Sequence, residues 1–280
     1  MFMNQFDFHI HSNYSDGDLA PCELYRKLMA SNVLICSITD HNNLEFYDNC
    51  TCFVNSHIKL VTGIELSACT EFSKEEHILG YNIDIHNKNL RAYCDDVKSS
   101  IYKVLLKCYR ILKKNRIIDS IEILNNRMSY NRLSDYLLKN NLLNNLKTLE
   151  DIYLQYSDLF DFPFYINYEE AIKLIKEAGG YAFLAHPFRN ISDNEFCEQI
   201  MNQYVVQKLD GIECYHPSNN LAEIESLRRY CIKNNLLISG GSDFHEMDSN
   251  ENDAVYYDDS LKKQYIHDLS KTIKCILKDK

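Results

Sequence analysis

The sequence lacks any apolar run long enough to cross a membrane. A transmembrane helix needs about 18 or more consecutive apolar residues, and no stretch of the 280-residue chain approaches that length. Tryptophan is absent as well, but we draw no chemical conclusion from that. Internal repeats and low-complexity segments are not evident. We therefore expect no membrane partner, and a globular chain with one large domain or one domain plus an insert.

A secretion signal is also missing from the start of the sequence. Residues 1–7 run directly into a strand-like pattern, without the charged and apolar segments of a signal peptide. The chain holds eleven cysteines, an odd number. Together these features predict reduced thiols in the cytoplasm, with structural or incidental roles. Cys50 and Cys52 resemble half of a metal knuckle, but no matching second pair is present.

An excess of positive charge is absent, because 40 acidic residues outnumber 30 Lys and Arg and the formal net charge is −10. Proteins that bind duplex nucleic acid are usually basic, so the composition argues against a duplex partner. The charge is uneven, however: residues 98–147 hold eleven Lys or Arg against three acidic residues. This basic segment either draws in anionic substrates or is simply a solvated helix face.

Seven short apolar runs recur along the chain, and each is followed or bordered by a polar cluster. Several are continuously apolar, which is typical of strands buried on both faces of a parallel sheet. Helical patterns lie between them, at residues 21–31, 168–178 and 221–234. This alternation predicts an α/β fold. The runs are Phe6–Ile10, Val33–Ile38, Lys59–Ile64, His77–Tyr81, Tyr181–Ala185, Asp210–Cys214 and Leu236–Ser239.

Residues 89–165 interrupt this alternation. The segment opens with a long amphipathic helix whose apolar stripe includes Val97, Val104 and Leu105, with Lys103 and other basic residues off the stripe. We predict a helical insert at 89–165, a possible lid or substrate-binding subdomain. Residues 1–88 and 166–280 would then form the catalytic domain.

The polar clusters that border the runs are alike in composition. Histidine and carboxylate side chains recur at the borders of successive apolar runs. Chance does not explain so many of these residues at corresponding positions. In a strand, residues i and i+2 point the same way, so both imidazoles of a His-x-His pair can face one point. The clusters are His9 and His11, Asp16, Asp40 and His41, Glu65, His77, His186, and Asp243 and His245.

Such side chains suit divalent metal ions. The carboxyl ends of strands form the active-site face of α/β folds, and imidazole with carboxylate suits Zn²⁺, Mn²⁺ or Fe²⁺. Nine groups exceed the ligands that one ion needs, whereas two or three ions sharing a bridging carboxylate would use them all. The pattern predicts a multinuclear metal centre of a hydrolase.

Seven motifs carry a resemblance to a known family. In chain order they are FHIHSNYSDG, SITDH, GIELS, HILGYNID, AHPFR, GIECYHPSN and GGSDFH. The sequence resembles the PHP (polymerase and histidinol phosphatase) family of metal-dependent phosphoesterases, in its stand-alone branch with a helical insert. The resemblance implies a distorted seven-stranded (β/α)7 TIM-like barrel with a helical insert.

The resemblance also implies a trinuclear site. Every ligand position of the family pattern is filled. The first ion would be held by His9, His11, Glu65 and Asp243, the second by Glu65, His77 and His186, and the third by Asp16, His41 and His245. Arg189 and His216 match positions that contact substrate phosphate, and either His216 or a metal-bound water would protonate the leaving oxygen. No serine or cysteine nucleophile is required, although Cys214 lies near the motif residues in sequence.

The expected reaction is hydrolysis of phosphate mono- or diesters by a metal-bridging hydroxide, with two to three divalent ions as cofactors. The expected substrates are small nucleotides or short single-stranded 5′-phosphorylated oligonucleotides. A sugar cyclic-phosphate diesterase, a histidinol-phosphate-type phosphatase, a metal-dependent amide hydrolase and a non-catalytic module are the alternatives. Oligomeric state and metal identity do not follow from the sequence.

Overall fold

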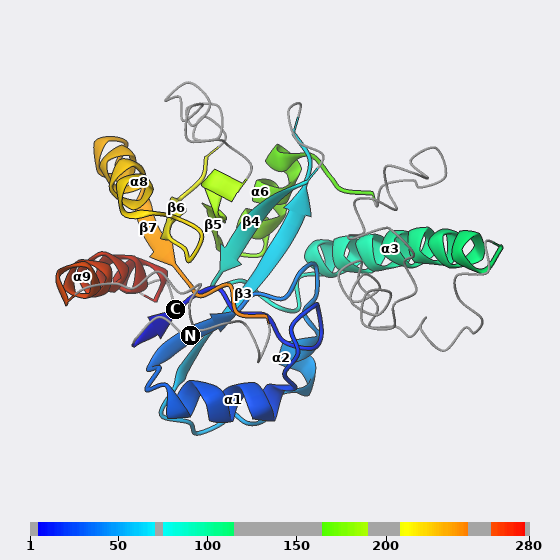
Figure 1. The fold of residues 1–280 in the computed structure, drawn as a ribbon, viewed down its shortest axis with the longest axis horizontal. Coiled ribbons are helices and arrows are strands. Elements are labelled where there is room, and N and C mark those ends of the chain that lie inside the picture. Colours follow the sequence, from blue (N-terminus) through cyan, green and yellow to red (C-terminus); the bar gives the residue numbers. More distant parts are fainter. Residues whose placement is uncertain (1–4, 71–74, 115–163, 190–207, 246–258, 278–280) are drawn as a thin grey trace. The chain divides into compact units, whose positions relative to one another are not determined.

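The computed structural model describes residues 5–70, 75–114, 164–189, 208–245 and 259–277. The seven runs form the seven strands of one sheet, ordered as they follow along the chain (Figure 1). The predicted α/β class is therefore confirmed. The strands are β1 (Phe6–Asp7), β2 (Ile35–Ile38), β3 (Lys59–Ala68), β4 (Glu76–Tyr81), β5 (Tyr181–Leu184), β6 (Gly211–Tyr215) and β7 (Leu237–Gly240).

The sheet nearly closes into a barrel, because the chain after β1 pairs with the end of β7 and the residues that follow it. The backbone N–H of Phe8 donates to the carbonyl of Gly240 (3.2 Å), and that of His11 donates to Phe244 (3.0 Å). An isolated parallel bridge joins Ile10 to Phe244. The distorted seven-stranded TIM-like barrel is thus confirmed.

The expectation of a purely parallel sheet is wrong at one strand. β4 pairs antiparallel with both β3 and β5, whereas the other neighbouring strands are parallel. Apolar content reports that a strand is buried, but it does not report the direction in which the strand runs. The reversal matters for the site, because β4 begins at the end of the barrel where its neighbours finish.

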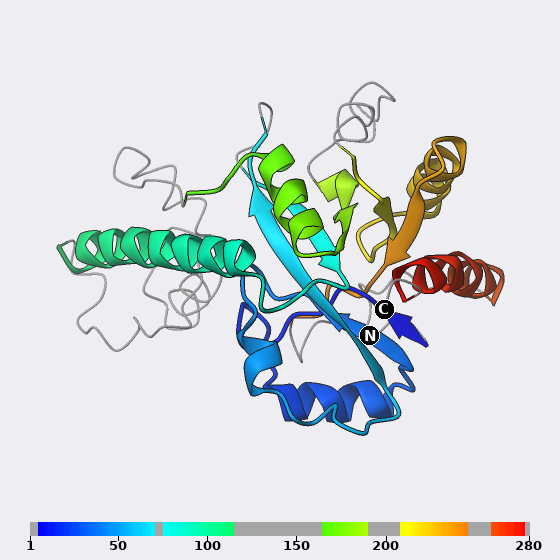
Figure 2. The same cartoon turned by 180° about the vertical axis from the view of Figure 1, so that it is seen from behind.

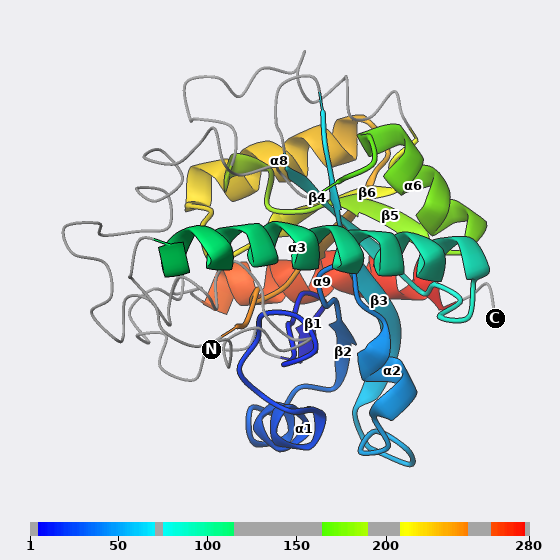
Figure 3. The same cartoon turned by 90° about the vertical axis from the view of Figure 1, so that its right-hand side faces the viewer.

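Helices cover the outside of the strands in the first compact unit (Figures 1 and 2). Leu24 and Leu28 of the first helix pack in one buried cluster with Cys36 and Ile38 of β2, and Figure 3 shows that helix beside β1 and β2. No helix in the described ranges combines the length and apolar character that crossing a bilayer requires. The helices of this unit are α1 (Pro21–Ala30), α2 (Glu45–Asn49), α6 (Tyr168–Glu177), α8 (Leu221–Lys233) and α9 (Asp259–Ile276), with a 3-10 turn at Pro187–Arg189.

Local signals set the limits of these helices. The side chain of Asn167 accepts a hydrogen bond from the Glu170 N–H (2.9 Å) at the start of α6, as an N-cap residue does. Asn220 and Glu223 form a reciprocal capping box at the start of α8. Just past the end of α6, Gly179 takes a positive φ of 73°, which glycine adopts without a steric cost.

The chain divides into two compact units, Met1–Arg91 with Ile166–Lys280, and Ala92–Tyr165. The long helix α3 (Lys88–Lys114) contains the predicted amphipathic segment: Val97, Val104 and Leu105 are buried and Lys103 is exposed. Residues 115–163 lie outside the described residues. The predicted domain limits and the proposed lid role of 89–165 stay predictions.

The cysteines require a correction. Cys22 and Cys52 form a disulfide, so the prediction that all the thiols are reduced is wrong. The two residues are 30 positions apart, and neither motif spacing nor cysteine parity indicated that they would meet. The cytoplasmic location stays a prediction.

Candidate metal centre

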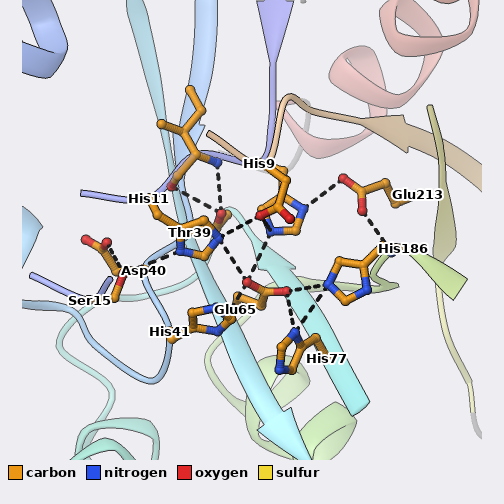
Figure 4. A network of polar contacts seen from close by, with 12 residues as sticks. His9, His11, Ser15, Thr39, Asp40, His41, Glu65, His77, His186 and Glu213 are labelled. Carbon is orange, nitrogen blue, oxygen red and sulfur yellow. Dashed lines mark hydrogen bonds and ion pairs between the residues drawn. The ribbon is translucent and has the colours of Figure 1, made fainter. Parts of the chain in front are cut away.

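All nine predicted ligand side chains converge at the end of the barrel where β1, β2, β5 and β7 finish. Figure 4 shows His9, His11, His41, Glu65, His77 and His186 of this set. His77 joins them from the beginning of β4, because that strand runs in the opposite direction and pairs Ser67 with His77. Glu65 comes from within β3. The whole predicted set, now in contact, is His9, His11, Asp16, His41, Glu65, His77, His186, Asp243 and His245.

Glu65 is the centre of this cluster. Its side chain is fully buried, and its two oxygens lie within 3.3 Å of ring nitrogens from five histidines. Burial alone would raise the pKa of Glu65, but these imidazoles, His41 foremost, hold it well below its ordinary value. The five are His9, His11 and His41 at Oε2, and His77 and His186 at Oε1.

Asp243 faces the same point from the segment after β7. Its Oδ1 lies 3.2 Å from Nε2 of both His9 and His11. The backbone of Asp243 has a φ of 48°, and that of His186 a φ of 23°. Positive φ is costly for residues other than glycine and is concentrated at functional sites. Two of the nine side chains are therefore held by backbone that the surrounding fold must enforce.

A second, outer group surrounds Asp16. Asp16 Oδ1 lies 3.3 Å from Nε2 of His245, and Oδ2 lies 3.7 Å from Nε2 of His41. The side chains of His245 and His41 are 26% and 22% exposed, whereas those of His9 and His11 are fully buried. The cluster therefore has a closed inner part and a more open outer part.

The donor set fits metal ions. Within the described residues, the buried Nε2 of His11 and Nδ1 of His41 make no hydrogen bond, although they lie 3.1 and 3.3 Å from Oε2 of Glu65. Buried polar atoms normally have a partner. Atoms that each lie about 2 Å from one ion are roughly 3 Å apart, which is the spacing found here. Among the described residues, four sets of three or four side chains have ligand atoms close enough to hold an ion. Three sets consist of predicted ligands, and the fourth joins His9 to Glu213 and His216.

Glu213 supports the cluster, and sequence reasoning missed it. This fully buried carboxylate lies in β6, with Oε1 2.9 Å from His9 Nδ1 and Oε2 accepting the backbone N–H of His186 (2.8 Å). A charged residue inside the predicted apolar run Asp210–Cys214 was the available signal, because buried charges are rare without partners.

Asp40, like Glu213, is a buried carboxylate that supports the cluster through hydrogen bonds. Its carboxylate accepts the N–H of Ser12 (2.7 Å) and the hydroxyls of Ser12 (2.6 Å) and Ser15 (2.7 Å). Burial raises the pKa of Asp40 despite these hydrogen bonds. The sequence placed Asp40 in a polar cluster but gave it no role. It holds the turn that leads from His11 to Asp16.

Close backbone approach fixes two glycines at the site. A Cβ at Gly241 would lie 2.3 Å from the backbone nitrogen of His9, and one at Gly17 would lie 2.4 Å from the carbonyl oxygen of His11. No side chain fits at either position. Both glycines are therefore needed for the chain to pack closely against the backbone of His9 and His11.

Arg189 and His216 lie beside Asp243. His216 is buried, with Nε2 3.2 Å from Asp243 Oδ2, and Arg189 Nη1 lies 3.7 Å from the same oxygen with a side chain 58% exposed. Their roles toward a substrate stay predictions. Cys214 points elsewhere, because its sulfur lies 3.6 Å from that of Cys231 and burial raises its thiol pKa.

Comparison with known proteins agrees with this geometry. The sequence matches the family model described as PHP domain over residues 7–266. A 5'-3' exoribonuclease of Haemophilus influenzae is 26% identical over 86% of this chain and 90% of its own length. A phosphoribosyl 1,2-cyclic phosphate 1,2-diphosphodiesterase of Eggerthella lenta is 24% identical over 85% of this chain and 93% of its own.

A solved structure shares the fold. It is a crystal structure of a candidate metal-dependent phosphoesterase from Bifidobacterium adolescentis. The two structures align with a TM-score of 0.73 at 19% sequence identity, and the alignment covers 94% of this chain and 96% of the other. The match of the family model spans nearly the whole barrel, and the nine side chains lie together within it. The chain therefore belongs to the PHP domain family and is a metal-dependent phosphoester hydrolase.

Proposed function

We propose that this chain hydrolyses phosphate esters of small nucleotides or short 5′-phosphorylated oligonucleotides, with two to three divalent ions held around Glu65. The observation that carries the proposal is the two-sided contact of this carboxylate. Oε2 meets one group of imidazoles, which includes His9, and Oε1 meets another, which includes His77. A carboxylate in this position can bridge two ions.

The proposed ligand sets follow the clusters. Imidazole and carboxylate suit Mn²⁺, Fe²⁺ or Zn²⁺. When bound, such ions supply Lewis acidity and lower the pKa of coordinated water. The sets are His9, His11, Glu65 and Asp243; Glu65, His77 and His186; and Asp16, His41 and His245.

Arg189 would bind the phosphoryl group. Its side chain is 58% exposed at the edge of the cluster, and Nη1 lies 3.7 Å from Asp243 Oδ2, so the guanidinium can turn toward a substrate. Guanidinium groups pair with phosphate oxygens through two parallel N–H donors. Arg189 thus orients the ester and offsets charge that develops on its non-bridging oxygens.

His216 would donate a hydrogen bond to the leaving oxygen. The backbone N–H of Ser218 donates to His216 Nδ1 (3.2 Å), so in the neutral ring the proton sits on Nε2. That nitrogen faces Asp243 Oδ2 at 3.2 Å, on the side of the cluster. A neutral imidazole fixed in this tautomer can donate an Nε2–H hydrogen bond to an adjacent leaving oxygen and so offset the negative charge that develops there.

Net charge guides the choice of substrate size. With a formal charge of −10, the chain repels long polyanions, so a small or single-stranded substrate is favoured over a duplex. The Haemophilus influenzae relative, described as a 5'-3' exoribonuclease, supports an RNA substrate. The Eggerthella lenta relative supports the second candidate, a sugar cyclic-phosphate diesterase.

Phosphate release by the Mn²⁺-loaded chain tests the proposal. The panel contains a 5′-phosphorylated short oligonucleotide, AMP, 3′,5′-bisphosphoadenosine, histidinol phosphate and a ribose cyclic phosphate. We expect turnover of a nucleotide substrate by the parent and by His57→Ala, a control at an exposed histidine outside the cluster, and none by His9→Ala. Turnover of the cyclic phosphate alone would favour the second candidate. Activity confined to an amide panel would overturn both.

A further inference from the structure

Glu213 is a buried charge that none of the proposed ligand sets uses. Its side chain is fully buried in β6, and it approaches the cluster from behind His9. We propose that Glu213 is a positioning residue, which fixes the tautomer of His9 and ties His9 to the backbone of His186. The inference rests on the proposed function, because it concerns the same metal centre.

The geometry of His9 defines the first half of this role. Nδ1 of His9 lies 2.9 Å from Glu213 Oε1, while Nε2 lies 3.1 Å from Glu65 Oε2 and 3.2 Å from Asp243 Oδ1. Carboxylates face both ring nitrogens, and a carboxylate can only accept a hydrogen bond. With an ion between Nε2 and the carboxylates of Glu65 and Asp243, the lone pair of the neutral ring would be on Nε2, and the proton would be on Nδ1, where Glu213 accepts it. A metal ligand nitrogen must be unprotonated, and Glu213 selects that form.

The second oxygen of Glu213 provides the other half of the positioning role, which is the link to His186. Oε2 accepts the backbone N–H of His186 (2.8 Å), a residue whose φ is 23°. The side chain of His186 reaches Glu65 Oε1 at 3.1 Å. One carboxylate therefore orients the ring of His9 and stabilises the strained backbone that aims His186. These two histidines lie on opposite oxygens of Glu65.

His11 offers an internal contrast. Its Nδ1 meets the hydroxyl of Ser15 at 3.4 Å, and that hydroxyl donates to Asp40 (2.7 Å). Asp40 thus acts on His11 through an intermediate, and the carboxylate that faces His11 Nδ1 directly, that of Asp16, lies 3.6 Å away. Glu213 contacts His9 directly at 2.9 Å. Removing Glu213 should therefore weaken metal binding more than Ser15→Ala does.

Replacement by glutamine is informative because it keeps the shape but changes the acceptors. Glu213 accepts one N–H at each oxygen, and an amide has only one acceptor oxygen. In Glu213→Gln one of the two donors must face an NH₂ group. Partners that orient metal ligands typically contribute 10–100-fold to metal affinity, so we expect Mn²⁺ to bind about 10–100-fold more weakly.

Asp268 provides a matched control. It is a buried carboxylate in α9 that also accepts two donors, from Tyr215 Oη (2.8 Å) and Arg228 Nε (2.7 Å). No histidine contact with Asp268 occurs among the contacts of the described residues. Asp268→Asn should lower the melting temperature and leave Mn²⁺ affinity unchanged. The comparison separates loss of a buried carboxylate from loss of this particular one.

The test is Mn²⁺ titration of the full chain by calorimetry, without any phosphate ester. Weaker Mn²⁺ binding in folded Glu213→Gln, with parent-like binding in Asp268→Asn, supports the inference. Equal Mn²⁺ affinity in Glu213→Gln and parent would overturn it and leave the proposed function intact. No Mn²⁺ binding by the parent would overturn both. If the parent hydrolyses no phosphate ester of the panel but Glu213→Gln still binds Mn²⁺ more weakly than the parent, only the proposed function is overturned.

A second measurement decides the case if Glu213→Gln does not fold. Nitrogen-15 NMR of the Zn²⁺-loaded parent reports which ring nitrogen of His9 carries a proton, and contacts to Gly241 assign the ring. A hydrogen-bonded proton on Nδ1 supports the inference. A proton on Nε2, or none on Nδ1, contradicts it.

Discussion

The inner and outer parts of the histidine cluster differ in their exposure to solvent and in the hydrogen bonds that support their imidazoles. In the inner part, the side chains of His9 and Glu65 are fully buried, and the carboxylate of Glu213 in β6 lies behind the imidazole of His9. The outer part, around Asp16, has histidines with about a quarter of their surface exposed. Solvent access and supporting hydrogen bonds govern metal retention. The same ligand chemistry should therefore hold ions firmly on one side and exchange them on the other.

Removing the carboxylate at the centre of the inner part should have the largest effect. Glu65 contacts five imidazoles, and Glu65→Gln offers only one acceptor oxygen to them. Metal ions contribute several kcal/mol to such reactions, so we expect kcat to fall about 1000-fold or more. Phosphate release and metal content measure it. Parent-like turnover by a folded variant would break the account.

Removing a ligand from the outer part should have a more limited result. His245→Ala deletes an imidazole that contacts Asp16 (3.3 Å) and is partly exposed. We expect the variant to bind one ion fewer and to keep the inner ions. In the parent, a chelator should release the outer ion before the rest. Elemental analysis during chelation measures the order, and simultaneous release of all the ions would show that the two parts do not differ.

A smaller loss is expected outside the ligand set. Arg189 lies at the exposed rim, 3.7 Å from Asp243. Hydrogen bonds to charged groups contribute about 1.5–3 kcal/mol, so Arg189→Ala should lower kcat/KM about 10–100-fold. A rise in KM would indicate ground-state binding, and a fall in kcat would indicate transition-state stabilisation. Unchanged constants would exclude Arg189 from substrate binding.

The smallest effect concerns a carboxylate away from both parts. Asp48 accepts two hydrogen bonds from Arg91 (2.7 and 3.0 Å), and these lower the pKa of Asp48. A lowered folded pKa contributes stability above the unfolded pKa of about 3.9. That contribution is lost as pH falls through the folded value.

The pair is partly exposed, so Asp48→Asn should cost only about 0.2–1 kcal/mol of unfolding free energy at pH 7. The difference from the parent should vanish in acid, below the folded pKa of Asp48. Urea unfolding at several pH values measures it. A difference that persists unchanged in acid would show that the ion pair is not its source.

The sequence was sufficient to predict the strands and the side chains that converge, because both depend on local patterns. Apolar runs marked the strands, and histidine with carboxylate at their borders marked the cluster. The direction of β4 was not predictable in this way, because an apolar run reads the same in either direction. His77 still reaches the site because the reversal brings the start of β4 beside the ends of its neighbours.

Supporting residues were harder to predict than the ligands they orient. Glu213 acts on His9 across 204 positions of sequence, and its role depends on which nitrogen it faces. Cys22 and Cys52 likewise meet only through the fold. Such roles depend on long-range geometry, which residue type and spacing do not encode. The buried charge in an apolar strand was nevertheless a visible sign for Glu213.

Anomalous diffraction from crystals of the Mn²⁺-loaded chain, recorded at the manganese edge, tests the central claim most directly. The account predicts at least two manganese peaks, one on each side of the Glu65 carboxylate, with lower occupancy beside Asp16. A single peak remote from Glu65, or manganese bound only at the protein surface, would contradict it.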